Sequence, residues 1–179
     1  MISSYSKHKT KILCYKIMDT TVNKSLIINE LSKLINKGNA HVTFDDAVED
    51  IPLDKLAIVP ENLPYNLWQL TEHIRIAQWD ILEFCMNPRH KSPKWPDEYW
   101  PGSTEVPDRI NWETCLKQIK ADRQRFIQLI NDPDIDLYHP LAHGTGQNIF
   151  REALLIADHN AYHVGQIILI RRLLNIWKG

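Results

Sequence analysis

The chain contains 179 residues, of which 44% are hydrophobic and 24% are charged, a composition typical of one soluble globular domain. The sequence holds no apolar stretch of about 20 residues, which a membrane-spanning helix would need. The formal net charge of −1 gives no electrostatic reason to expect a nucleic-acid partner.

The first 18 residues differ from the rest of the chain in charge. They contain four lysines and no acidic residue, and their apolar stretch is too short for a secretory signal or an anchor. We predict that residues 1–18 form a disordered basic extension, with Met18 as an alternative initiator. Residues 19–179 are predicted to form a single domain.

Apolar residues recur at intervals of three and four in four segments. This spacing predicts amphipathic helices over residues 20–37, 65–84, 110–130 and 148–177. Gly38 and Pro88 are expected to end the first two helices, and Asn148 can cap the start of the fourth. Residues 44–50, with the sequence PheAspAspAlaValGluAsp, could form a short helical piece, and no strand alternation is visible.

These segments predict an all-α fold, namely a four-helix bundle. Each of the three connections is 17 residues or longer, whereas about two to eight residues are usual in simple bundles. Long crossover connections and parallel neighbouring helices are therefore allowed.

The connection over residues 88–107 is rich in proline and aromatic residues. Its five prolines exclude a continuous helix or a central strand, and it carries Trp95, Tyr99 and Trp100. A loop of this length usually has a function. We expect it to pack over the end of the bundle or the mouth of a pocket.

Two histidines stand four residues apart in the last predicted helix, in AlaAspHis159AsnAlaTyrHis163ValGlyGln. Side chains four residues apart on a helix share one face, so both imidazoles can reach the same cation. His73 lies in the second predicted helix and supplies a third nitrogen ligand. Three histidines are the ligand set of an open metal site, which keeps one position for water or substrate.

A buried histidine can also be an ordinary hydrogen-bonded core residue, and this reading suits His73 taken alone. It suits the pair His159 and His163 less well, because each unsatisfied buried imidazole costs about 1–3 kcal/mol. Neutral nitrogen ligands suit Zn²⁺, Ni²⁺, Fe²⁺ or Cu²⁺ better than Ca²⁺ or Mg²⁺. The chain lacks the Glu-x-x-His pairs of di-iron bundles and the H-E-x-x-H of zinc proteases.

Other polar residues give weaker signals. Asn160 and Gln166 could point into the metal cavity or form hydrogen bonds on the helix surface, and no catalytic residue is assigned. Glu72 and Asp158 each precede a candidate ligand, point away from it and are expected to be solvated. For His139 and His143 we predict roles in a turn. For His8, His41 and His90 we predict no particular partner.

The three cysteines are widely spaced and form no C-x-x-C pair, which favours a reduced compartment and a cytoplasmic location. None has an evident base nearby, so we expect structural roles for Cys14, Cys85 and Cys115. A thiol that takes part in chemistry would then have to come from outside the chain.

The segments LeuTrpGlnLeuThrGluHis73 and AlaAspHis159AsnAlaTyrHis163ValGlyGln, with the loop TrpProAspGluTyrTrpPro between them, resemble the DinB/YfiT-like family of helical metalloproteins. The resemblance covers roughly residues 20–177. It implies a four-helix bundle with an up-down-down-up course, a divalent metal held by these three histidines, and frequent homodimers.

The family resemblance implies less about the reaction. Relatives include S-transferases and an isomerase that use low-molecular-weight thiols. We therefore expect a metalloenzyme with one divalent transition metal, zinc, nickel or iron, that activates a low-molecular-weight thiol for transfer to an electrophile. Two alternatives stay open: a metal-hydroxide hydrolase of small amides or esters, and a non-catalytic, metal-binding, dimeric stress-response protein.

Overall fold

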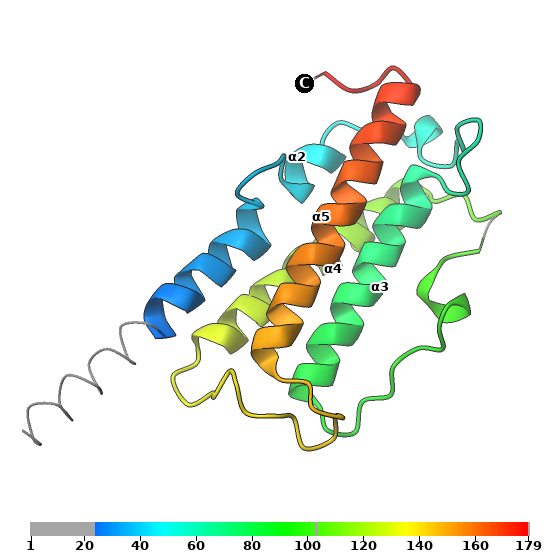
Figure 1. Cartoon of the computed structure of the whole chain (residues 1–179). Coiled ribbons are helices and arrows are strands. Elements are labelled where there is room, and N and C mark those ends of the chain that lie inside the picture. Colours follow the sequence, from blue (N-terminus) through cyan, green and yellow to red (C-terminus); the bar gives the residue numbers. More distant parts are fainter. Residues whose placement is uncertain (1–23, 103, 179) are drawn as a thin grey trace, which may run out of the picture.

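The computed structural model describes residues 24–102 and 104–178, and within them the protein is a bundle of α-helices without β-strands (Figure 1). The first described helix occupies residues 24–37. It is followed by the short α2 (Phe44–Val48), α3 (Leu67–Met86), α4 (Arg109–Asn131) and α5 (Ile149–Leu173). Two 3-10 turns, η1 (Leu53–Lys55) and η2 (Asp97–Tyr99), lie in the connections. The predicted all-α helical bundle is thus confirmed, while the predicted 1–18 extension lies outside the described residues.

The helices begin where the sequence offers side-chain caps. The Asn66 side chain accepts a hydrogen bond from the backbone N–H of Gln69, whose side chain bonds back to the Asn66 N–H, and such a box satisfies two unpaired donors of the first turn. Asn148 caps α5 as predicted. The end of α5 was predicted too late, because the chain leaves the helix after Leu173 and Asn175 adopts a φ of 56°.

Contacts between the long helices give their directions. Gln78 and Glu83 of α3 bond in the same order to Ile119 and Arg125 of α4, so α3 and α4 run the same way. α5 runs opposite to α3, because Asn160 bonds to Gln78 whereas the later Gln166 bonds to Tyr65, just before the start of α3. The predicted up-down-down-up course stays a prediction for the first helix, whose beginning lies outside the described residues. None of the described helices combines the length and apolar character needed to cross a bilayer.

The buried apolar side chains form two separate clusters along the bundle. The upper core surrounds the start of α3 and the second half of α5, and it includes Trp68, Ile74, Ile119, Val164 and Ile167. The lower core surrounds the end of α3 and the first half of α5, and it includes Ile81, Leu82, Phe126, Ile130 and Ile156. A polar layer separates them, in which Asn160 of α5 donates to the Gln78 side chain of α3, 3.1 Å away, and Gln78 donates to the Ile119 carbonyl of α4.

Candidate metal centre

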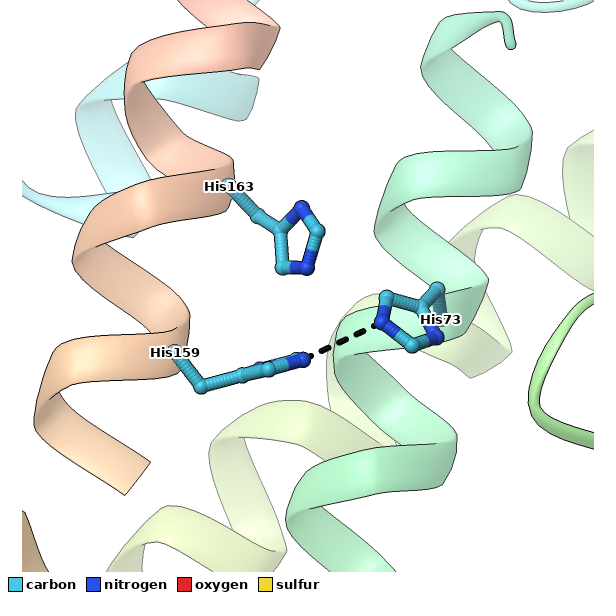
Figure 2. A group of neighbouring side chains, drawn as sticks. All are labelled: His73, His159 and His163. Carbon is cyan, nitrogen blue, oxygen red and sulfur yellow. Dashed lines mark hydrogen bonds between the residues drawn. The ribbon is translucent and has the colours of Figure 1, made fainter. Parts of the chain in front are cut away.

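Three imidazoles converge between α3 and α5 (Figure 2). His73 comes from α3, and His159 and His163 come from successive turns of α5. Each ring offers one nitrogen, and these atoms lie within 4.8 Å of one another. The Nε2 atoms of His73 and His159 are 3.1 Å apart. The convergence predicted from the helical spacing is therefore present.

The fold of the two helices places these rings toward the interior. His163 is 6% exposed and lies on the same face of α5 as Ile156 and Ile170, which are buried in the two cores. His73 is only 2% exposed, and His159 is half-buried. Burial of the aliphatic residues thus fixes which way the imidazoles point.

Hydrogen bonds at the second ring nitrogen orient two of the three imidazoles. His73 Nδ1 lies 2.8 Å from the backbone carbonyl of Tyr99, and His163 Nδ1 lies 2.6 Å from the side-chain oxygen of Gln166. Because these oxygens only accept hydrogen bonds, each Nδ1 carries the proton and each Nε2 keeps a free lone pair. The Gln166 amide nitrogen donates to the Tyr65 hydroxyl at 2.6 Å, which fixes the amide in this orientation.

The donor set fits a divalent transition metal. Nitrogen ligands at about 2.0–2.1 Å in a tetrahedral arrangement lie roughly 3.3 Å from one another, close to the 3.1 Å between Nε2 of His73 and Nε2 of His159. In the metal-free protein the Nε2–H of His159 can donate a hydrogen bond to the free lone pair of His73 Nε2, and a bound cation would replace this hydrogen bond with two metal–nitrogen bonds. The groups that orient His73 and His163 are a backbone carbonyl and an amide, so these two ligands stay neutral.

Electrostatics also favour the neutral, ligand-competent form of the imidazoles. Burial lowers the pKa of His73 and of His163 below the ordinary value of 6.5. Burial, followed by the proximity of His163 and His73, lowers the pKa of His159 to about 4. A site that keeps its ligands unprotonated at neutral pH needs to release few protons when a cation binds.

The lowered pKa of His159 predicts how the stability of the metal-free protein depends on pH. The unfolded chain binds a proton at His159 below about pH 6.5, whereas the folded chain does so only near pH 4. The histidine contribution to stability is therefore fully present above about pH 6.5 and is lost as the pH falls through this window. We expect the Tm of chelator-treated protein to fall between about pH 7 and pH 5, and to fall less in His159→Gln. Equal pH slopes in both proteins would contradict this assignment.

The aromatic loop packs against the candidate site, while its expected position over a pocket mouth or the end of the bundle stays a prediction. Trp100 stacks on His73 with ring centroids 3.9 Å apart and planes 4° apart, and Tyr65 stacks on Trp100 at 6.2 Å. Trp95 lies 6.4 Å from His73 and is 70% exposed. The loop therefore shields His73 on one side and leaves an exposed indole at the edge of the centre.

Sequence reasoning missed the carboxylate that anchors this loop. Asp80 of α3 is buried, accepts from the Tyr99 hydroxyl at 2.5 Å, and lies 2.7 Å from His90 Nε2. Our expectation that His90 lacks a partner was therefore wrong. The carboxylate acts on the centre through Tyr99, whose carbonyl orients His73. A Pro-rich segment gives no periodicity from which this long-range pairing could be read.

Substitution of Asp80 should weaken metal binding by the three histidines. We expect Asp80→Ala to lower metal affinity roughly tenfold, because supporting partners of metal ligands typically contribute 10- to 100-fold. The matched control is Asp97→Ala, an exposed acid of the same loop, whose affinity should stay at the wild-type level. Isothermal titration with Zn²⁺ measures both variants. Equal affinities in Asp80→Ala and wild type would show that the loop does not position His73.

Other predictions have mixed outcomes. Asn160 faces α3 and bonds to Gln78 rather than to the helix surface. Asp158 is exposed as expected, but the expectation for Glu72 was wrong, because it forms an ion pair with Arg75 and its side chain is only 15% exposed. His143 lies 2.7 Å from the Phe84 carbonyl, which fits a structural role in its turn region.

The two described cysteines are buried, free thiols. Burial raises the pKa of Cys85 to about 12 and also raises the pKa of Cys115. Neither forms a thiolate readily at neutral pH, which agrees with the predicted structural roles. Cys14, Met18 and His8 lie outside the described residues.

Comparison with known proteins gives one family match. A model of the DinB superfamily matches residues 40–167, a span that contains all three histidines and the aromatic loop. No match was found among curated proteins or among solved structures.

Proposed function

The chain belongs to the DinB superfamily, and we propose that it is a divalent-metal-dependent enzyme in which His73, His159 and His163 hold one cation. Zinc, nickel and iron(II) suit this nitrogen set. The proposed reaction is the transfer of a low-molecular-weight thiol to an electrophilic small molecule. The family match and the histidine cluster support the metal-binding part, and the arguments below support the reaction.

The neutrality of the ligands is the observation that carries this proposal. His73 and His163 are oriented by a backbone carbonyl and an amide, and both imidazoles stay uncharged. The positive charge of a cation at this place is therefore not cancelled by its ligands. A divalent cation held in this way supplies Lewis acidity that lowers the pKa of a bound thiol and favours the thiolate.

The residues around the centre define what the protein itself contributes. The three imidazoles hold the cation on one side, and Trp100 covers a face of His73. The exposed Trp95 offers an apolar surface beside the centre, which suits an uncharged or aromatic electrophile. Because the pKa values of the buried Cys85 and Cys115 are raised, the reacting sulfur is expected to come from a cosubstrate.

In the proposed transfer the thiol loses its proton to solvent, and its sulfur forms a new bond to the electrophilic carbon. The leaving group departs from that carbon with the bonding electron pair, so no oxidant or reductant is required. The product is a thioether. Placing the two reactants beside one centre converts an encounter in solution into a reaction between oriented groups.

Turnover assays on protein of known metal content test the proposal. Zinc-, nickel- or iron-loaded protein is mixed with cysteine, glutathione or coenzyme A and with chlorodinitrobenzene, whose thioether product absorbs light. We expect a thiol-dependent rate above background, which His159→Ala lowers to background. His139→Ala removes an exposed histidine outside the cluster and should leave the rate unchanged.

A parallel assay separates thiol transfer from hydrolysis. Metal-loaded protein is given a nitrophenyl ester without any thiol, because hydrolysis needs the same ligands but no thiol. Ester turnover without thiol, combined with no thiol-dependent product from any pair, would overturn the proposed transfer. Metal-loaded protein that turns over neither substrate would contradict the enzymatic part and favour a metal-binding protein.

A further inference from the structure

A groove lies between the short helix α2 and the first half of α4, and none of the three histidines lines it. Its volume is about 520 Å³, which is within the range of small-molecule sites. The floor is apolar and consists of Phe44, Val48, Ile51, Trp112 and Leu116. The first four are buried and Leu116 is half-buried, so the floor can shield an apolar part of a ligand from water.

Two buried arginines hold the α2 side of this groove in place. Arg123 of α4 is 4% exposed, and its Nη2 lies 2.7 Å from an Asp45 carboxylate oxygen. Arg171 of α5 is equally buried and donates to the backbone carbonyls of Asp46 and Ala47. The Asp46 carboxylate belongs to the capping box of α2. Because a buried guanidinium without partners is costly, these contacts fix α2, and the groove is formed before a ligand binds.

The two edges of the groove carry opposite charges. Exposed carboxylates line the α2 edge at Glu49 and Asp50. The exposed Lys117 and Lys120, which share one side of α4, line the other edge. Among residues 24–102 and 104–178, none of these four forms an ion pair. Two charges of each sign therefore remain available on either side of an apolar floor.

We propose that this groove binds a small zwitterionic molecule of the short-peptide type, at a site separate from the metal centre. The ligand's carboxylate lies beside Lys117 and Lys120, its ammonium group lies beside Glu49 and Asp50, and its apolar side chains lie over Trp112. A purely anionic molecule would face the carboxylates of one edge, and a purely cationic one would face the lysines of the other. The paired charges thus select a ligand that carries both signs.

Isothermal titration with a dipeptide and its two capped forms tests the required charges. Phenylalanyl-leucine has both charges and an apolar body, and we expect it to bind with a Kd below about 1 mM. N-acetylation removes the ammonium charge, and C-terminal amidation removes the carboxylate charge. Each capped form should bind about three- to tenfold more weakly, because it loses its contacts with one edge.

Paired substitutions of the lysines show which end of the ligand they contact. The double variant Lys117→Gln with Lys120→Gln should bind phenylalanyl-leucine about three- to tenfold more weakly. The same variant should bind the amidated dipeptide no more weakly than the wild type, because that ligand has no carboxylate to lose. The matched control is Lys91→Gln with Lys94→Gln, two exposed lysines outside the groove, whose affinity for phenylalanyl-leucine should equal that of the wild type.

The acidic edge provides the mirror test. Glu49→Gln with Asp50→Asn should weaken binding of phenylalanyl-leucine by a similar factor, because the ammonium group then loses its partners. Binding of the N-acetylated dipeptide should not weaken, since it has no ammonium charge. All four substitutions are at exposed positions, so the variants should unfold at temperatures close to that of the wild type.

Several results would overturn the proposed site. One is the absence of binding heat with phenylalanyl-leucine up to about 10 mM. Others are equal affinities for the dipeptide and both capped forms, or an unchanged affinity in both double variants. The site is independent of the metal centre, so His159→Ala should bind phenylalanyl-leucine like the wild type. Failure of the peptide site would leave the proposed thiol transfer unaffected.

Discussion

Replacement of His163 by alanine is expected to abolish stoichiometric metal binding. His163 supplies one of three nitrogens at the centre, and its loss leaves two protein ligands on a cation that prefers more. Loss of a direct ligand should exceed the roughly 10- to 100-fold effect of losing a supporting partner. Elemental analysis of untagged protein after dialysis measures the remaining metal directly.

Exposed histidines provide the matched control for this variant. His139→Ala removes an imidazole that is exposed and outside the cluster, so its metal content should equal that of the wild type. Comparable metal in the His163→Ala and His139→Ala variants would remove the basis of the proposed centre. Circular dichroism of His163→Ala should show helical content like that of the wild type, which excludes unfolding as the cause of metal loss.

Chelation should also lower stability, because the cation would link α3 to α5. A ligand that binds only the folded state stabilises it by about 2.7 kcal/mol at a free concentration of 100 times its Kd. The Tm difference between metal-loaded and chelated protein should therefore be clear in the wild type and small in His163→Ala.

Phe126→Ala is expected to cause the largest loss of stability among single core substitutions. The side chain is fully buried in the lower core, and truncation of such a phenylalanine costs about 3–5 kcal/mol. For a chain of this size that corresponds to a Tm decrease of about 10 °C. Chemical denaturation monitored by circular dichroism measures the change in the free energy of unfolding.

Phe126→Ala also distinguishes the effect of the lower core on stability from the effect of the histidines on metal binding. Phe126 lies in the lower core, whereas the histidines lie nearer the polar layer. Phe126→Ala should therefore bind one metal per chain at low temperature despite its lower stability. Phe126→Leu keeps most of the apolar volume, and its loss should be less than half that of alanine. Equal stability of Phe126→Ala and wild type would contradict the observed burial.

The sequence predicted the parts of the centre that follow from helical periodicity. The four-residue interval between His159 and His163 and the apolar pattern around His73 were enough to place three imidazoles on inward faces. The boundaries of α3 and α4 differ from the predicted ranges by two residues or fewer, because asparagine and aspartate caps and a nearby proline define them.

The remaining features depend on contacts between distant segments. The Tyr99 carbonyl that orients His73 and the Asp80 carboxylate that holds Tyr99 are joined only after the aromatic loop folds back over α3. A backbone carbonyl has no signature in the sequence, because every residue carries one. The sequence alone leaves open whether the Gln166 side chain points into the metal cavity or lies on the helix surface, because its partner Tyr65 is 101 positions away.

The polar layer between the two cores has a consequence for the alignment of the helices. If α3 slipped by one turn along α5, Gln78 would lose both Asn160 and the Ile119 carbonyl, and its amide would face aliphatic side chains. A buried amide without partners costs about 1–3 kcal/mol, whereas aliphatic contacts alone would penalise such a slip far less. The hydrogen bonds between the helices thus permit only one axial alignment. That alignment sets the height of His73 on α3 relative to His159 and His163 on α5.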